Sequence, residues 1–327
     1  MITLIKNATL INEGEQFVSD VLLTNGKINK IEKNIEQKAD RVIDAKGLHL
    51  LPGVIDDQVH FREPGLTHKG DITTESRAAV AGGITSFMEM PNTIPNATTC
   101  KLLEEKFSRA AEVSSANYSF FMGTTNDNLN EIQNIDFSQV CGLKIFLGSS
   151  TGNMLVNNSK TLDRIFKEVK TLIAVHAEDD PLVQKNLEKV KEFYGEDILP
   201  YFHSIIRNDE VCYKSSSAAV ELATKHGTRL HILHVSSAKE LSLFTNKIPL
   251  KEKKITAEAC IHHLWFYDED YATKGNLIKW NPAVKTLHDR EKIWEALLDG
   301  RIDVIATDHA PHTAEEKAQP YLKAPSG

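Results

Sequence analysis

Hydrophobic and polar positions divide the chain into two parts with different patterns. In the first part, short segments alternate apolar and polar residues, which is typical of half-buried strands. Two of these segments, residues 21–24 and 27–31, flank the dipeptide Asn25-Gly26, a strong signal for a two-residue hairpin turn. We therefore expect a small β-domain over residues 1–52.

From residue 53 onward, short apolar runs alternate with segments of helical period. Charged helical faces appear, for example, over Thr161–Lys170 and Arg290–Leu298. The expected strands are Val54–Phe61, Ile84–Met90, Tyr118–Met122, Leu143–Leu147, Leu172–His176, Arg229–Val235, Ile255–Cys260 and Asp303–Asp308. Strands joined by helical crossovers in this number predict an α/β fold, a (β/α)8 barrel over residues 53–327, whose functional residues sit where the strands end.

Composition narrows the range of partners. The chain has 327 residues, with 38 Lys+Arg against 45 Asp+Glu and a formal net charge of -7, which argues against nucleic acid or an anionic membrane as the main partner. Charged and polar residues interrupt the first residues, and no stretch is apolar enough to span a bilayer, so we expect a cytoplasmic protein. The four cysteines are scattered, which favours buried thiols over disulfides or a zinc knuckle.

Polar side chains collect at the ends of the expected strands. A lone histidine on an apolar strand is more often a packed core residue than a ligand, but packing does not explain several at successive strand ends. The residues at these ends are Gln58, His60, Arg62, Asn92, Lys144, His176, His234, Asp308 and His312. A site at the carboxyl ends of the barrel strands is therefore expected.

The first strand carries a candidate metal-binding pair. Alternate residues of a strand share a face, so Gln58 and His60 are expected to point the same way. Imidazole is a good zinc ligand, whereas a glutamine amide oxygen is a neutral, weaker donor. Taken alone, this segment fits equally well a histidine that is satisfied by hydrogen bonds.

Lys144 lies in an otherwise apolar strand, where an unpaired ammonium is costly. It should therefore be neutral, paired or chemically modified. Carbamylation by carbon dioxide would turn it into a carboxylate able to bridge two cations. The alternative is a lysine that extends along the strand to the barrel mouth.

The remaining candidates differ in strength. His231 and His234 are three residues apart, so on a strand only one can face inward; we expect His234 to be a ligand and His231 to be structural. Glu178 precedes an acidic helical run, which favours a helix-start or solvent role. Asp308 ends an apolar strand and is the strongest carboxylate, a candidate ligand and proton shuttle.

These residues match a known family. In chain order, the markers are His60-Phe61-Arg62-Glu63-Pro64-Gly65, Met90-Pro91-Asn92-Thr93, Gly142-Leu143-Lys144, Val175-His176-Ala177-Glu178, His234-Val235-Ser236, His262-His263-Leu264, Asn281-Pro282-Ala283 and Thr307-Asp308-His309-Ala310-Pro311-His312. Together they make the chain resemble the dihydroorotases of the amidohydrolase superfamily over nearly all of its length.

The resemblance implies an enzyme that hydrolyses the cyclic amide of (S)-dihydroorotate reversibly to N-carbamoyl-L-aspartate in de novo pyrimidine biosynthesis, by a metal-bound hydroxide. One or two Zn²⁺ ions are implied. Carried over by position, the carbamate of Lys144 would bridge, His176 and His234 would hold one ion, and His60 with Asp308 would hold the other, with Gln58 as a weak ligand. The implied substrate-binding residues are Arg62, Asn92, Asn281 and His312.

Departures from the family pattern keep alternatives open. Some members use an aspartate after the fourth strand instead of the lysine, but residues 148–153 hold no carboxylate, so Lys144 is the bridging candidate. Gln58 weakens one metal site and supports a different hypothesis, an inactive scaffold that partners aspartate transcarbamoylase. Allantoinases and hydantoinases share the metal residues. A homodimer is a further expectation, and the chain is expected to lack a C-terminal part that completes the barrel and the β-domain.

Overall fold

A computed structural model describes residues 1–148 and 152–327. Residues 149–151, which belong to the stretch expected to lack a carboxylate ligand, lie outside the described residues. The chain divides into two compact units, Met1–Val54 and Ile55–Gly327.

The first unit is a β-sheet. Its strands are β1 (Ile2–Asn12), β2 (Glu15–Thr24), β3 (Lys27–Glu32), β4 (Arg41–Asp44) and β5 (His49–Leu50). They pair in the order β3-β2-β1-β4, with β5 also on β1. The predicted hairpin is confirmed: Thr24 pairs with Lys27, and Asn25 and Gly26 between them have φ values of 50° and 77°, the left-handed conformation of this turn type.

The second unit is built on an eight-stranded sheet that runs in sequence order. Its strands are β6 (Val54–Val59), β7 (Ile84–Glu89), β8 (Asn117–Gly123), β9 (Gly142–Phe146), β10 (Ile173–His176), β11 (Leu230–Ile232), β12 (Ile255–Cys260) and β13 (Val304–Ala306). Val59 forms a parallel bridge with His309, and the His60 amide donates to the His309 carbonyl at 2.7 Å. These contacts bring the two edges together, so the predicted barrel is confirmed as a nearly closed one.

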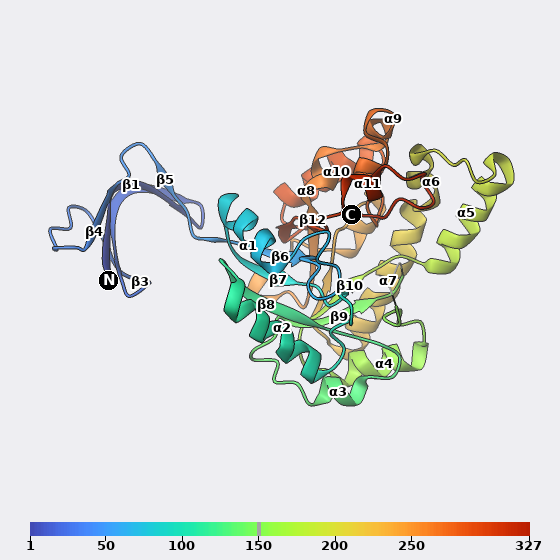
Figure 1. Cartoon of the computed structure of the whole chain (residues 1–327), viewed down its shortest axis with the longest axis horizontal. Helices are drawn as coiled ribbons and strands as arrows, with labels where there is room; N and C mark the ends of the chain where they lie inside the picture. The colour runs from blue at the N-terminus through green and yellow to red at the C-terminus, as the bar shows by residue number, and fades with distance from the viewer. Residues whose placement is uncertain (149–151) are drawn as a thin grey trace. The chain divides into compact units, whose positions relative to one another are not determined.

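Helices lie around the outside of these strands (Figure 1). They are α1 (Ile72–Ala81), α2 (Cys100–Val113), α3 (Leu129–Gln133), α4 (Ser159–Glu168), α5 (Asp180–Tyr194), α6 (His203–Ile206), α7 (Asp209–His226), α8 (Ile261–Trp265), α9 (Tyr271–Lys274), α10 (Leu287–Leu298) and α11 (Ala314–Lys317). Side-chain caps start several of them; Asp71, for example, accepts from the Thr74 amide at 2.7 Å. In the described part of the chain, no helix has both the length and the apolar character that crossing a membrane requires.

Several strands end one to three residues earlier than the sequence pattern predicts. Among them, the sixth barrel strand stops at Ile232 and the eighth at Ala306, where Val235 and Asp308 were expected. His234 and Asp308, which follow them, have φ values of 40° and 48°. This left-handed backbone is uncommon for residues with a side chain, and it turns both residues out of the strand direction.

A buried ion pair ties helix α2 to the barrel mouth. The Lys106 ammonium lies 2.9 Å from a Glu89 carboxylate oxygen, and both side chains are almost fully buried. The other Glu89 oxygen accepts from the Phe61 amide at 3.1 Å. Because Phe61 lies between His60 and Arg62, this carboxylate helps to hold the segment that carries both.

We predict that Lys106→Met lowers the free energy of unfolding by about 3–5 kcal/mol, since it leaves a buried carboxylate without its counter-ion. Urea unfolding at neutral pH measures the change. The double variant Lys106→Met/Glu89→Gln should recover most of the loss. A loss below about 1 kcal/mol in the single variant would contradict a stabilising role for the pair.

Candidate active site

The predicted site residues surround one cavity of about 650 Å³ in the barrel unit. Its lining includes Gln58, His60, Arg62, Asn92, Lys144, His176, His234, Asn281, Asp308 and His312. The structure therefore brings every one of them together. Their individual roles stay predictions, and the geometry below is what supports them.

His176 and His234 face each other across this cavity. The His176 Nδ1 lies 3.0 Å from the His234 Nε2, and the rings meet edge to face with centroids 4.7 Å apart. The opposite nitrogen of His176, Nε2, donates to a Glu178 carboxylate oxygen at 3.0 Å. The Nδ1 of His176 therefore presents its lone pair toward His234, as a metal ligand would.

The expectation for Glu178 was wrong. Its side chain is fully buried rather than exposed at a helix start, and it accepts from both His176 and the Arg207 guanidinium. Burial favours a raised pKa, but the Arg207 charge and the His176 hydrogen bond outweigh it and hold the pKa of Glu178 below its usual range. No periodic signal in the sequence relates Glu178 to Arg207, because Arg207 follows the short helix α6, well away from Glu178 in the chain.

His60 and Asp308 form a second pair. The His60 Nε2 lies 3.0 Å from an Asp308 oxygen, and the His60 Nδ1 donates to the Asn92 side-chain oxygen at 2.7 Å. Burial would raise the pKa of Asp308, but the hydrogen bond and charge of His60 keep it below its usual value. Asp308 is therefore ionised. Gln58 is buried, and its Oε1 lies 3.7 Å from the Cys260 sulfur.

Lys144 is one of the largest fully buried side chains, with 1% of its surface exposed. Lys144 also lines the mouth cavity, so its side chain reaches the barrel mouth without exposing the ammonium to bulk solvent. Its Nζ lies 4.7 Å from the centroid of the Phe146 ring. Burial lowers the pKa of Lys144 to about 8. A neutral amine is the form that reacts with carbon dioxide, so the surroundings suit carbamylation.

Arg62 is held at the same cavity by the loop after β13. Its Nε donates to the Pro311 carbonyl at 3.0 Å, and its Nη2 donates to the His312 Nε2 at 3.0 Å. The His312 Nδ1 donates to Glu316 at 2.9 Å. Burial and the Arg62 charge lower the pKa of His312 to about 4, so its neutral ring accepts from the guanidinium. These contacts fix the plane of the guanidinium.

His231 and His234 both face the barrel interior, contrary to the expectation that only one can. His231 pairs in register with Thr256 and lies inside the strand, where its Nε2 approaches Asp57 and Glu258. His234 reaches the cavity because its left-handed backbone breaks the alternation of the strand. The Glu258 carboxylate accepts from the His234 amide at 3.0 Å and supports this turn.

Two carboxylates beside His231 are strongly affected by burial. Burial and the nearby Glu258 charge raise the pKa of Asp57 to about 7. Burial raises the pKa of Glu258 to about 8. Neither residue was singled out from the sequence, since nothing in the local pattern relates Asp57 on β6 to strands β11 and β12.

A barrel with histidines, a buried lysine and an aspartate at its strand ends defines a metal-dependent cyclic amidohydrolase. The L-hydantoinase (dihydropyrimidinase) of Arthrobacter aurescens superimposes with a TM-score of 0.93 at 28% identity, over 99% of this chain and 73% of that chain. A D-hydantoinase structure superimposes with a TM-score of 0.89 at 24% identity, over 100% and 74%, which shows the shared fold.

Sequence relatives narrow the class. Residues 47–240 match the dihydro-orotase-like family. The dihydroorotase of Methanosarcina mazei is 32% identical over 99% of this chain and 72% of the relative. The dihydroorotase of Bacillus cytotoxicus is 34% identical over 99% and 75%. The chain belongs to the dihydro-orotase-like family.

We predict that Glu178→Gln weakens metal binding at the His176 side of the cavity by about 10–100-fold, because the carboxylate that orients His176 is replaced by a neutral amide. Competition with a chromophoric chelator measures the affinity. Glu188→Gln, an exposed change on the neighbouring helix α5, serves as the control. Equal affinities of the two variants would show that Glu178 does not position His176.

Proposed function

We propose that the chain is a dihydroorotase, which interconverts (S)-dihydroorotate and N-carbamoyl-L-aspartate in de novo pyrimidine biosynthesis. In the hydrolytic direction, water adds to the ring amide carbonyl, the carbon–nitrogen bond breaks and the nitrogen takes a proton. The observation that carries the proposal is the buried Arg62 guanidinium, which lines the same cavity as His176, His234 and Asp308. The dihydroorotases among its sequence relatives support it.

Arg62 favours a substrate that bears a carboxylate. Its Nε and Nη2 are held by Pro311 and His312, which leaves further N–H groups of the guanidinium for an anion. Planar guanidinium and carboxylate groups match in two-pronged geometry. Dihydroorotate has such a carboxylate on its ring, whereas hydantoin does not. Arg62 therefore selects the dihydroorotate interpretation over the hydantoinase and allantoinase alternatives.

Asn92, Asn281 and His312 would complete the substrate site. The Asn281 side-chain oxygen is buried without a hydrogen-bond partner among the described residues. Such an orphaned acceptor is costly unless a ligand donates to it. A ring N–H of the substrate is a suitable donor. Asn92 already orients His60 through its own oxygen, so it links the substrate site to the metal ligands.

The residues at the mouth fit a zinc centre. His176 and His234 present nitrogens toward each other at 3.0 Å, and Lys144 is a buried amine suited to become a carbamate. We propose that these three hold the tighter ion, and that His60 and Asp308 hold a second one, with Gln58 as a weak ligand. Zinc, when bound, would supply Lewis acidity that polarises the carbonyl and lowers the pKa of water to about 7.

Asp308 is the proposed proton carrier. It is ionised and held by His60, so it can accept a proton from the attacking water and return it to the departing ring nitrogen. Retention of this carboxylate beside the buried Lys144 favours an enzyme over the inactive scaffold. A cytoplasmic location, a homodimer and an association with aspartate transcarbamoylase stay predictions.

We predict that Arg62→Lys lowers kcat/KM for dihydroorotate by at least about 10-fold while metal content stays unchanged, since lysine keeps the charge but loses the two-pronged geometry. KM should rise first. Steady-state assays with parallel elemental analysis test this, and Arg77→Lys on the exposed face of α1 is the control. Unchanged kinetics, or faster hydrolysis of hydantoin or allantoin than of dihydroorotate, would transfer the assignment to another cyclic amidase.

We predict that Gln58→His raises metal occupancy beside His60, because imidazole binds zinc better than a neutral amide. Wild-type protein should already hydrolyse dihydroorotate, and Asp308→Ala should abolish this activity. Elemental analysis measures the metal occupancy, and dihydroorotate turnover by folded, metal-supplemented protein measures the activity. Absence of any Asp308-dependent turnover in folded wild-type protein would favour the scaffold.

A further inference from the structure

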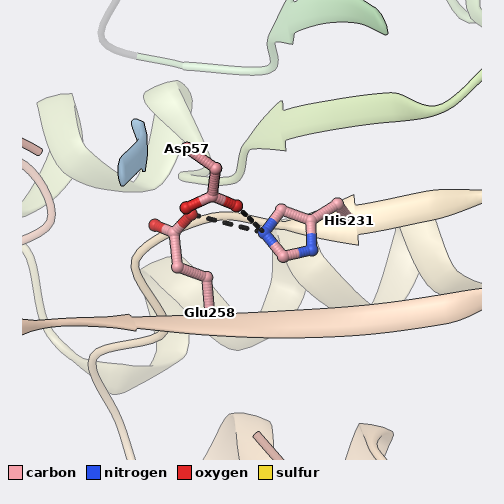
Figure 2. Close-up of side chains that lie close together, drawn as sticks. All are labelled: Asp57, His231 and Glu258. Atoms are coloured by element: carbon pink, nitrogen blue, oxygen red, sulfur yellow. Dashed lines mark hydrogen bonds and ion pairs between the residues drawn. The ribbon is translucent and has the colours of Figure 1, made fainter. Parts of the chain in front are cut away.

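A second polar cluster lies inside the barrel, apart from the residues assigned to the mouth. It consists of Asp57 on β6, His231 on β11 and Glu258 on β12, which we call the inner cluster. Figure 2 shows both carboxylates directed at the same imidazole nitrogen. The His231 Nε2 lies 3.3 Å from a Glu258 oxygen and 3.6 Å from an Asp57 oxygen.

The tautomer of His231 is set from its other side. Its Nδ1 lies 2.8 Å from the Thr256 hydroxyl oxygen, and that hydroxyl donates to the Leu230 carbonyl at 3.4 Å. The hydroxyl therefore accepts from the Nδ1–H of His231. In the neutral ring, the Nε2 then carries a lone pair. Three acceptors, one nitrogen and two carboxylate oxygens, consequently meet at one point.

Such a meeting of acceptor atoms requires a proton or a metal ion between them. No lysine or arginine among the described residues forms an ion pair with Asp57 or Glu258; their ion-pair partner is His231. In the same described part of the chain, the second Asp57 oxygen is buried and has no hydrogen-bond partner. The inner cluster therefore offers an unused ligand atom, and its two carboxyl groups, when deprotonated as metal ligands are, have only His231 beside them.

We propose that the inner cluster binds a divalent transition-metal ion of the zinc class, separate from any ion at the mouth. The ligand atoms all lie within 4.8 Å of one another. A tetrahedral ion with ligands at about 2.0–2.1 Å separates them by roughly 3.3–3.4 Å, close to the 3.3 Å and 3.6 Å observed. The Thr256 hydroxyl orients the histidine ligand from behind, as outer partners of metal ligands do.

An ion here would also stabilise the mouth. The Glu258 oxygen that faces away from His231 accepts from the His234 amide at 3.0 Å and from the Cys260 thiol at 3.4 Å. Fixing Glu258 through a metal therefore fixes the left-handed turn at His234. The ion is structural in this assignment, and it contacts no substrate.

The test uses the whole 327-residue chain with the changes His60→Ala/His176→Ala, which remove one ligand from each mouth pair. Co²⁺ is added to the apoprotein and followed by absorption and equilibrium dialysis, with Zn²⁺ as competitor. One equivalent of Co²⁺ should remain bound. Adding Asp57→Asn should weaken this binding by more than about 10-fold, whereas Asp56→Asn, a change in the neighbouring carboxylate that bonds Thr307, should not.

Two results would overturn the proposal: a folded double variant that binds no Co²⁺, or one whose bound Co²⁺ survives both Asp57→Asn and Glu258→Gln. Where a variant fails to fold, crystals of the unaltered chain grown with Zn²⁺ provide a second measurement, and anomalous density among the three side chains is expected. Its absence there would count equally against the site. Because the experiment measures metal binding and not activity, its result does not depend on whether the chain hydrolyses dihydroorotate.

Discussion

Burial of charge inside the barrel is the constraint on which the site depends. An ionised group removed from water is tolerated when a partner of opposite charge lies beside it. Glu89 and Glu178 meet this condition through Lys106 and Arg207, and Asp308 lies beside the His60 ring. Among the described residues, the Lys144 amine has no ion-pair partner, and the two carboxylates of the inner cluster share the single His231 ring. A carbamate and a metal ion are proposed at these two places, because each would supply a charge that the side chains lack.

Most of the fold, and the residues that line the mouth cavity, could be predicted from the sequence. Apolar runs separated by helical segments mark all eight strands, since a buried parallel strand must be apolar on both faces. The carboxyl ends of the parallel barrel strands all lie at the same end of the barrel. Polar residues at these ends can therefore be assigned to one cavity from the sequence alone. Gln58 and His312 meet there although almost the whole barrel separates them in the chain.

The rest depended on contacts that no local pattern contains. Strand alternation assigned one inward residue to the pair His231 and His234, but the strand stops at Ile232 and His234 turns with a φ of 40°. Alternation holds for regular backbone and fails at a left-handed residue. Likewise, the position of Glu178 just after a strand and before an acidic helix is typical of an exposed residue. Its burial depends on an ion pair with Arg207, which follows a short helix in another part of the chain.

The groups that hydrogen-bond to the proposed metal ligands explain why the two metal sites at the mouth should differ in affinity. His176 is oriented by the ionised Glu178, and the His234 backbone is held by Glu258. At the other proposed metal site, Gln58 is an uncharged ligand that lies beside a thiol. There, His60 is oriented by the Asn92 amide rather than by a carboxylate. A carboxylate behind an imidazole raises its basicity, and an amide does so less. The site that contains His176 and His234 is therefore the stronger one, and Glu258, shared with the inner cluster, makes its geometry depend on what the inner cluster holds.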